Sequence, residues 1–385
     1  MVEGILRGLR VVEVSAFVAA PLAGATLASL GADVLRVEQL DGGVDARRWP
    51  LHEGRSLYRA GLDRGKRSIG LDLRSARGQE LAAKLVTQPG VDGGILVTNL
   101  PARGWMAYER LAERRPDLVM VIIEGTPEGD TAVDYTVNAG IGFPWVTGPK
   151  GLPGPVNHVL PAWDVATGML TTATVLAAER HRRLSGEGQA VRLALSDVAL
   201  AVAGHLGFLA EAAVVEEPRQ RFGNELYGTY GRDFRTADGR FVMVSALTGR
   251  QWKALADATG LADQFRALEA THGVDLADDG ARFELRHEIS ALVEPWIATR
   301  TFSDVKERFD THDVLWGPYR TFKELLRQEP RASKLAASPI RFKSHPPQPA
   351  PSTSDIGADT EAVLREILGL SDDAIAQLRM AGVIR

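Results

Sequence analysis

Short apolar runs rich in Val, Ile and Leu alternate with Ala- and Leu-rich segments of helical spacing along the first third of the chain. Continuous apolar runs of this length are typical of strands buried on both faces of a sheet. Their alternation with helices predicts a parallel sheet covered by helices on both sides, which is an α/β, Rossmann-like fold. Predicted strands cover residues 9–15, 32–38, 67–73, 93–99 and 118–125, and predicted helices cover residues 20–31, 77–86 and 108–116.

The pattern changes in the second half of the chain. Residues 186–212 predict a turn, a short strand and a helix that is apolar nearly all round and is therefore expected to be buried. Residues 216–234 are rich in Gly, Tyr and charged side chains, which indicates a linker. Next, Asp238 and Gly239 lie between two alternating runs and predict a β-hairpin over residues 233–247.

The chain has 385 residues, which exceeds the size at which single cores stop growing, so we expect two domains. A large Rossmann-like domain is expected over residues 1–220 and a smaller α+β domain over residues 221–320. Residues 321–385 are expected to return to the large domain and complete it. Within them, the Pro-rich stretch 346–351 is expected to cross the surface, because proline fits neither a helix interior nor a central strand.

Composition narrows the class of protein. The chain has no cysteine, which excludes disulfides, thiolate catalysis and iron–sulfur ligation. A formal net charge of −4 gives no electrostatic reason to expect nucleic acid. No apolar window reaches the length of a membrane span and the N-terminus lacks the regions of a signal peptide, so we expect a cytoplasmic protein without a membrane contact. The first predicted helix does not open with GxGxxG, so no dinucleotide site is expected.

One carboxylate stands at the start of a long predicted helix. Asp164, in PAWDVATGM, precedes an apolar helical segment that ends in a cluster of Arg and His, and no second acid is near it in sequence. This is the position of an N-cap, whose side chain accepts hydrogen bonds from free backbone N–H groups. Capping and chemistry are both compatible with it. For chemistry, a helix N-terminus favours the ionised carboxylate, and its N–H groups stabilise an oxyanion on the carbonyl under attack.

An ordered set of segments runs along almost the whole chain: GLRVVEVSAFVAAPLAGATLASLGADVLRVE, GKRSIGLDLRSARGQELAAKLV, TNLPARG, PAWDVATGM and AERHRRLSGEGQAVRLAL. In order and spacing they resemble the family III CoA-transferases, which include formyl-CoA transferase and the α-methylacyl-CoA racemases. The resemblance implies a large Rossmann-like domain and a small domain in each subunit. It also implies two subunits interlocked as a homodimer and an acyl-CoA substrate.

A narrower resemblance, carried by RRWP, NLPARGW, VDYTVNAG, NHVLPAWD and YGTYGRDF, is to the intramolecular CoA transferases of this family. It implies that Asp164 is the nucleophile and passes through an aspartyl anhydride and an aspartyl-CoA thioester. The expected reaction moves CoA from carbon 1 to carbon 4 of mesaconate. CoA is then part of the substrate, and the scheme needs no tightly bound cofactor and no metal.

Three other activities remain open at this point. One is an intermolecular CoA transferase that uses another carboxylic acid. A second is an α-methylacyl-CoA racemase, but Val133 stands where the racemases carry their histidine, and valine cannot transfer a proton. His158 is the nearest histidine in sequence that could substitute as a base. The third is a CoA-binding protein that has lost catalysis.

Further candidate residues divide into two groups. By resemblance, the first group holds the phosphates and adenine of CoA, for which Lys and Arg are suited. The second group neutralises the free carboxylate of a dicarboxylic substrate or walls its pocket. The CoA candidates are Arg36, Lys66, Arg67, Ser68, Asn99 and Arg103, and the substrate candidates are Arg47, Arg48, Arg232, His158, Tyr227 and Trp163.

Overall fold

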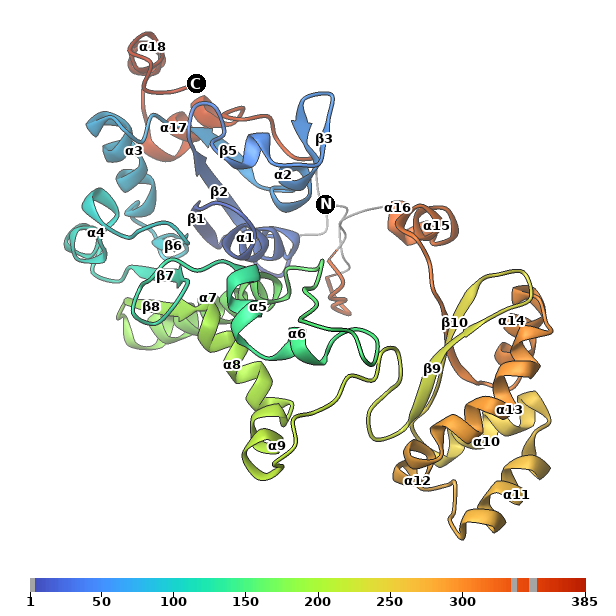
Figure 1. Cartoon of the computed structure of the whole chain (residues 1–385). Coiled ribbons are helices and arrows are strands. Elements are labelled where there is room, and N and C mark those ends of the chain that lie inside the picture. Colours follow the sequence, from blue (N-terminus) through green and yellow to red (C-terminus); the bar gives the residue numbers. More distant parts are fainter. Residues whose placement is uncertain (1–3, 334–337, 346–351) are drawn as a thin grey trace. The chain divides into compact units, whose positions relative to one another are not determined.

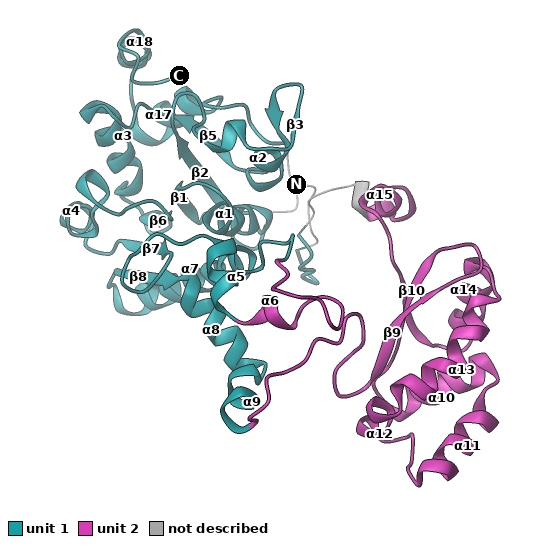
Figure 2. Ribbon diagram, viewed as in Figure 1, with its two compact units in different colours: residues 1–141, 158–214, 334–385 teal, residues 142–157, 215–333 magenta. Residues whose placement is uncertain are grey.

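The structure is a computed structural model that describes residues 4–333, 338–345 and 352–385. The expected surface crossing at 346–351 lies outside the described residues. The chain forms two compact units (Figure 2). Unit 1 comprises Met1–Ile141, His158–Val214 and Lys334–Arg385, and unit 2 comprises Gly142–Asn157 and Val215–Ser333.

Unit 1 is built on a six-stranded sheet in the order β5-β2-β1-β6-β7-β8, in which every paired strand runs parallel (Figure 1). The expected parallel α/β sheet is therefore confirmed. Its strands are β1 Arg10–Val14, β2 Asp33–Glu38, β5 Arg67–Gly70, β6 Ile95–Thr98, β7 Val119–Glu124 and β8 Gln189–Ala194.

Helices cover both faces of this sheet. Successive residues of each strand point to opposite faces, so neighbouring residues enter different cores. Val12 packs into a core that includes residues of α3, α4, α17 and α18, whereas Val11 packs into a second core with α1, α7 and the start of α8. The helices of unit 1 are α1 Ala19–Ser29, α2 Leu57–Leu62, α3 Ala76–Val86, α4 Tyr108–Arg114, α5 Asp134–Gly140, α7 Ala162–Ser185, α8 Leu195–His205, α9 Phe208–Val214, α17 Thr360–Leu368 and α18 Asp372–Met380. Unit 1 also contains the hairpin β3 Leu51–His52 and β4 Arg55–Ser56, and the 3₁₀ turns η1 Asp45–Arg47 and η2 Gly104–Met106.

The expectation that the apolar helix after β8 is buried all round is wrong for this single chain. Val198, Ala199 and Ala203 of α8 are buried. By contrast, Leu200 is 48% exposed, and Leu206, which follows the helix, is 63% exposed. Only one side of α8 is therefore packed against the rest of unit 1.

Unit 2 contains a three-stranded antiparallel sheet in the order β11-β10-β9, packed with helices. The expected hairpin is confirmed, since β9 pairs with β10 and Gly239 adopts a φ of 80° in the turn. The strands are β9 Tyr230–Arg235, β10 Phe241–Ala246 and β11 Leu315–Pro318. The helices are α6 Phe143–Val146, α10 Gly249–Thr259, α11 Ala262–His272, α12 Asp279–Glu284, α13 Arg286–Ala298, α14 Phe302–Thr311, α15 Phe322–Gln328 and α16 Pro330–Ser333.

The main segment of unit 2 begins at Val215, close to the expected 221, but the unit differs from the expected small domain 221–320 in two larger ways. First, the unit runs to Ser333, and its strand β11 pairs antiparallel with β10. Second, it includes Gly142–Asn157, a segment that is bonded to Arg221. The guanidinium of Arg221 donates hydrogen bonds to the carbonyl oxygens of Trp145 at 2.8 Å and Leu152 at 2.6 Å. Neither long-range pairing leaves a signal in the local sequence pattern.

The strand order creates a topological switch point in unit 1. From β1 the chain continues to β2 and β5 on one side, whereas β6, β7 and β8 extend the sheet on the other side. Loops that leave the carboxyl ends of β1 and β6 therefore diverge, and open α/β sheets bind ligands at such a crevice.

Candidate active site

A cavity of about 360 Å³ lies at the carboxyl ends of β1, β6, β7 and β8. Phe17 enters it from the loop after β1, Asn99 from the loop after β6, and Leu195 from the end of β8. Asp164 and Arg48 line the same cavity. Its volume falls within the range of about 300–1,000 Å³ that is usual for small-molecule sites.

Asp164 is the third residue of α7 and is not its N-cap, which corrects the expectation from sequence. The helix begins at Ala162, and the N-cap position is taken by Pro161, which makes no side-chain cap. Gly168, one turn further on, lies so close to α1 that a Cβ would stand 2.7 Å from the carbonyl oxygen of Ala19. This close approach seats the first turns of α7 against α1 and fixes the place of Asp164.

Asp134, at the start of α5, supplies the cap that α7 lacks. Its Oδ2 accepts hydrogen bonds from the backbone N–H groups of Trp163 at 2.7 Å and Asp164 at 3.1 Å. Its Oδ1 lies 2.9 Å from Nε2 of His158. The indole N–H of Trp163 donates to Oδ1 of Asn138 at 3.1 Å, which joins α5 to α7 a second time.

Asp134 is not among the residues expected from the sequence. Asp134 lies 30 residues before Asp164 in the sequence, so the two acids do not look like neighbours there. The available signal was an acid at the start of a helix that follows a buried strand, where parallel sheets carry their sites. His158 pairs with Asp134 and is not among the residues that line the cavity, whereas Val133 is among them.

Burial, followed by the charge of Asp134, raises the pKa of Asp164 from 3.8 to about 6, and the positive charge of Arg48 opposes the rise. A helix N-terminus alone would have favoured the ionised carboxylate. Burial and the neighbouring acid outweigh that effect, so ionisation of Asp164 in the folded protein costs free energy. Such groups are typical of functional sites.

Because its pKa is raised on folding, Asp164 makes the stability of the protein depend on pH. The folded protein binds the Asp164 proton more tightly than the unfolded chain, so stability falls as pH rises from about 4 to about 6, and the full cost remains above that range. Asp164→Asn removes the cost. We expect about 1–2 kcal/mol more stability at pH 8, after allowance for partial solvent screening, and little change near pH 4. Denaturant unfolding at both pH values measures it, and an equal gain at both would contradict it.

Arg48 is placed to bind an anion inside the cavity. Its guanidinium lies 4.3 Å from the ring centre of Tyr58 and 5.2 Å from that of Phe17, so two aromatic rings hold it. Its Nη1 is buried and has no hydrogen-bond partner among the residues that the structure describes. A buried donor without a partner is costly, and a ligand carboxylate would satisfy it.

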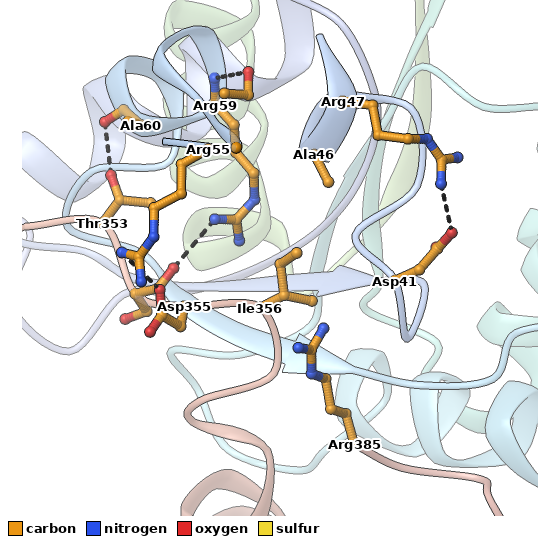
Figure 3. A pocket seen from close by; sticks show the side chains of 13 residues that line it. Asp41, Ala46, Arg47, Arg55, Arg59, Ala60, Thr353, Asp355, Ile356 and Arg385 are labelled. Carbon is orange, nitrogen blue, oxygen red and sulfur yellow. Dashed lines mark hydrogen bonds and ion pairs between the residues drawn. The ribbon is translucent and has the colours of Figure 1, made fainter. Parts of the chain in front are cut away.

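Arg47 points elsewhere, although it is the neighbour of Arg48 in sequence. Its side chain is 70% exposed and pairs with Asp41 at 3.0 Å. It lines a separate cavity of about 610 Å³, together with Arg55, Arg59 and Arg385 (Figure 3). The structure therefore separates the two arginines of the RRWP segment and places only Arg48 beside Asp164.

Asn99 lines the cavity and also joins the two loops at the switch point. Its Oδ1 accepts from the N–H of Ala16 at 2.9 Å, and its Nδ2 donates to the carbonyl of Ala16 at 2.6 Å. The next residue, Phe17, has a φ of 66°, and its N–H donates to Asp45 at 3.0 Å. A left-handed backbone at a non-glycine residue stores strain, and such strain concentrates at functional sites.

Three of the expected CoA contacts prove to be interior residues. Arg36 pairs with Glu13 and, at 3.0 Å, with Asp45, and only 3% of its side chain is exposed. Lys66 pairs with Glu13 at 2.9 Å and is 1% exposed. Ser68 is also buried, and its Oγ accepts from the N–H of Gly357 at 2.7 Å. A direct phosphate contact by these side chains is inconsistent with this burial, because each is committed to partners inside unit 1.

The two remaining CoA candidates lie at the surface of unit 1. Arg67 is 26% exposed and pairs with Glu366 at 2.8 Å and Asp33 at 3.5 Å. Arg103 is exposed, at the N-terminal end of η2, and its side chain has no partner among the described residues.

Tyr227 and Arg232 belong to unit 2. The ring of Tyr227 lies 5.3 Å from those of Phe222 and Phe283, in an aromatic cluster. Arg232 lies in β9, and its Nε donates to the carbonyl of Asp233 at 3.2 Å. Trp163, in unit 1, is 5% exposed and is part of the core next to Asp164.

Taken singly, none of the helices in 4–333, 338–345 or 352–385 combines the length and apolar character of a membrane span, and only the bent pair α8 and α9 does so together. Within the same ranges, no group of three or more His, Asp or Glu side chains is arranged to hold a metal ion.

The chain is similar to known proteins over most of its length. The sequence model of CoA-transferase family III matches residues 6–346. The chain is 49% identical over 401 residues to 2-methylfumaryl-CoA isomerase of Chloroflexus aurantiacus, covering 99% of this chain and 98% of that protein. It is 31% identical to succinate–glutarate CoA-transferase of Agrobacterium fabrum, covering 83% and 81% of the two chains. Its fold matches that of a CAIB/BAIF family protein from Brucella suis with a TM-score of 0.79 at 23% identity, over 95% of this chain and 100% of that one. The chain therefore belongs to CoA-transferase family III.

Proposed function

We propose that the protein is an intramolecular CoA transferase that converts 2-methylfumaryl-CoA, which is mesaconyl-C1-CoA, to 3-methylfumaryl-CoA, which is mesaconyl-C4-CoA. The observation that carries the proposal is that Asp164 and Arg48 line the same cavity. A carboxylate with a raised pKa suits nucleophilic attack on a thioester, and an arginine with a free buried donor suits the second carboxylate of a dicarboxylic acid. The 49% identity to the Chloroflexus isomerase supports the same reaction.

The first half of the reaction releases the acid. A carboxylate oxygen of Asp164 attacks carbon 1 of the thioester, the C–S bond breaks, and a mixed anhydride and CoA thiolate form. The thiolate then attacks the γ-carbonyl of Asp164 and breaks the anhydride, which leaves an aspartyl-CoA thioester and the free dicarboxylate. These are two acyl transfers in place of one difficult exchange.

The second half repeats these steps with the other end of the acid. The carbon 4 carboxylate attacks the aspartyl thioester, and the released thiolate then attacks carbon 4 and regenerates the Asp164 carboxylate. No proton is taken up or released in any step, so no base is needed. Arg48 can hold the spare carboxylate in both halves: that of carbon 4 before the exchange and that of carbon 1 after it.

The same geometry disfavours racemisation. Moving an α-proton needs a base and an acid at the substrate. Among the described residues that line the cavity there is no histidine, and Val133 lies where the racemases carry theirs. An intermolecular transferase would use the same nucleophile, so it is separated from the proposal by experiment.

The decisive experiment incubates purified protein with 2-methylfumaryl-CoA as the only acyl donor and acceptor, and resolves the two isomers by liquid chromatography. We expect isomer formation without an added acid, and no incorporation when ¹³C-mesaconate is present in the medium. A strict requirement for a second carboxylic acid would overturn the intramolecular assignment. Loss of α-deuterium from a branched acyl-CoA would point to the racemase instead.

We infer an interlocked homodimer in the cytoplasm, with CoA bound only as part of the substrate and with Arg67, Asn99 and Arg103 facing it. Support for a partner chain comes from the exposed apolar side of α8, at Leu200, and from Leu206. Light scattering coupled to size-exclusion chromatography is expected to give twice the 41.6 kDa mass of one chain.

A further inference from the structure

Asp134 is a buried acid that the scheme above does not use. Its side chain is 2% exposed, and both of its oxygens are engaged. Its Oδ2 accepts from two backbone N–H groups at the first turn of α7, and N–H groups at that place stabilise negative charge. Its Oδ1 is engaged by Nε2 of His158 at 2.9 Å.

The arrangement places the Asp134 carboxylate beside the nucleophile, where its negative charge opposes the ionisation of Asp164. Oδ2 of Asp134 is bonded to the backbone nitrogen of Asp164 itself, at 3.1 Å. The titratable and charged groups that line the cavity or lie near the two acids are His158 from the segment before α7, Tyr135 from α5, Tyr58 from α2, Arg48 from the loop after η1 and Glu124 from the end of β7. The positive charge of Arg48 offsets part of the repulsion between the two acids. Arg48 and Asp164 are both described by the structure, and they are not in ion-pair contact.

We propose that Asp134 is a positioning residue that fixes the first turn of α7 and whose charge destabilises the free Asp164 carboxylate relative to its acylated forms. This rests on the proposed function. When Asp164 attacks the thioester, its new C–O bond forms, the C–S bond breaks and the electron pair leaves on sulfur. Asp164 is then a neutral acyl group, so its repulsion with Asp134 is lost. The fixed charge therefore favours formation of the anhydride and of the aspartyl thioester.

Asp134→Asn tests this, because asparagine keeps an oxygen that can accept from the two N–H groups but removes the charge. In the wild type, kcat/KM is expected to fall below about pH 6, where Asp164 titrates in the free enzyme. In the variant we expect this limb to move down by about one pH unit, and kcat at pH 8 to fall by about tenfold. Asp134→Ser, which also caps without a charge, is expected to move the limb in the same direction.

The matched control is Asp130→Asn, which removes an exposed acid from the loop that leads into α5 and is expected to leave the pH profile unchanged. A loss of rate in both Asp134 variants with the acid limb still near pH 6 would overturn the electrostatic role. It would reduce Asp134 to a structural cap.

A second measurement does not depend on the reaction. Asp164→Asn is expected to raise Tm at pH 8 by a few degrees in the wild type, and by clearly less in the Asp134→Asn background, because the repulsion has already gone. Equal gains in the two backgrounds would contradict the proposal. If this cycle shows coupling but no isomerisation is found, the proposed function fails and the electrostatic coupling stands.

Discussion

Asp164→Asn is expected to lower turnover of 2-methylfumaryl-CoA by at least ~10³-fold, because the amide cannot form the anhydride on which every later step depends. Affinity for CoA is expected to change little, since the carboxylate makes the covalent bond and does not hold the nucleotide. Asp164→Ala is expected to behave in the same way. Steady-state rates and calorimetric binding of CoA measure the two effects separately. A variant with a near-normal rate would exclude Asp164 as the nucleophile.

The covalent intermediate gives an independent check of the same assignment. Hydroxylamine or borohydride added during turnover is expected to modify the wild-type peptide that contains Asp164, and to leave that peptide unmodified in Asp164→Asn. Peptide mass spectrometry reads out the site. Modification of a different acidic residue, with Asp164 intact, would place the chemistry elsewhere.

Arg48→Gln is expected to lower kcat/KM by ~10²-fold, because it removes a charge-assisted bond to the spare carboxylate inside a cavity. The released dicarboxylate would also be held less tightly between the two halves of the reaction. We therefore expect free mesaconate to appear in the medium during turnover of the variant, at a level above that of the wild type. Chromatography of the quenched mixture measures the isomers and the free acid together.

Arg47→Gln is the matched control, since Arg47 is adjacent in sequence but exposed and paired with Asp41. It is expected to leave the rate within about twofold, as for most surface substitutions. Similar losses in the two variants would show that the segment contributes only general positive charge. A normal rate in Arg48→Gln would remove Arg48 from the site.

The sequence by itself determined the elements and the candidate nucleophile. Strands and helices of the sheet unit follow from local periodicity, because a period of two or 3.6 residues depends on near neighbours alone. Asp164 stood out for the same local reason, at the start of α7. The resemblance of segments such as PAWDVATGM to family III CoA-transferases indicated the chemistry before any geometry was available.

Strand register explains why Arg36 and Ser68, two of the expected CoA contacts, are interior residues. In the parallel sheet, Glu13 of β1 is the register partner of Arg36, and Arg36 is the partner of Ser68 in β5. Register partners point to the same face, so the Arg36 side chain meets an acid inside the protein and cannot face a phosphate. Which strands pair is set by long-range packing, and no local pattern in the sequence records it.

Only the tertiary structure decided which groups share the cavity. Asp134 comes from α5 and caps α7, which turns an apparently isolated acid into one of two neighbouring carboxylates. Adjacent Arg47 and Arg48 are equivalent in sequence, yet only Arg48 lies between two aromatic rings and faces Asp164. Burial and the proximity of charges set the pKa of a carboxylate, and both arise only when distant segments pack together.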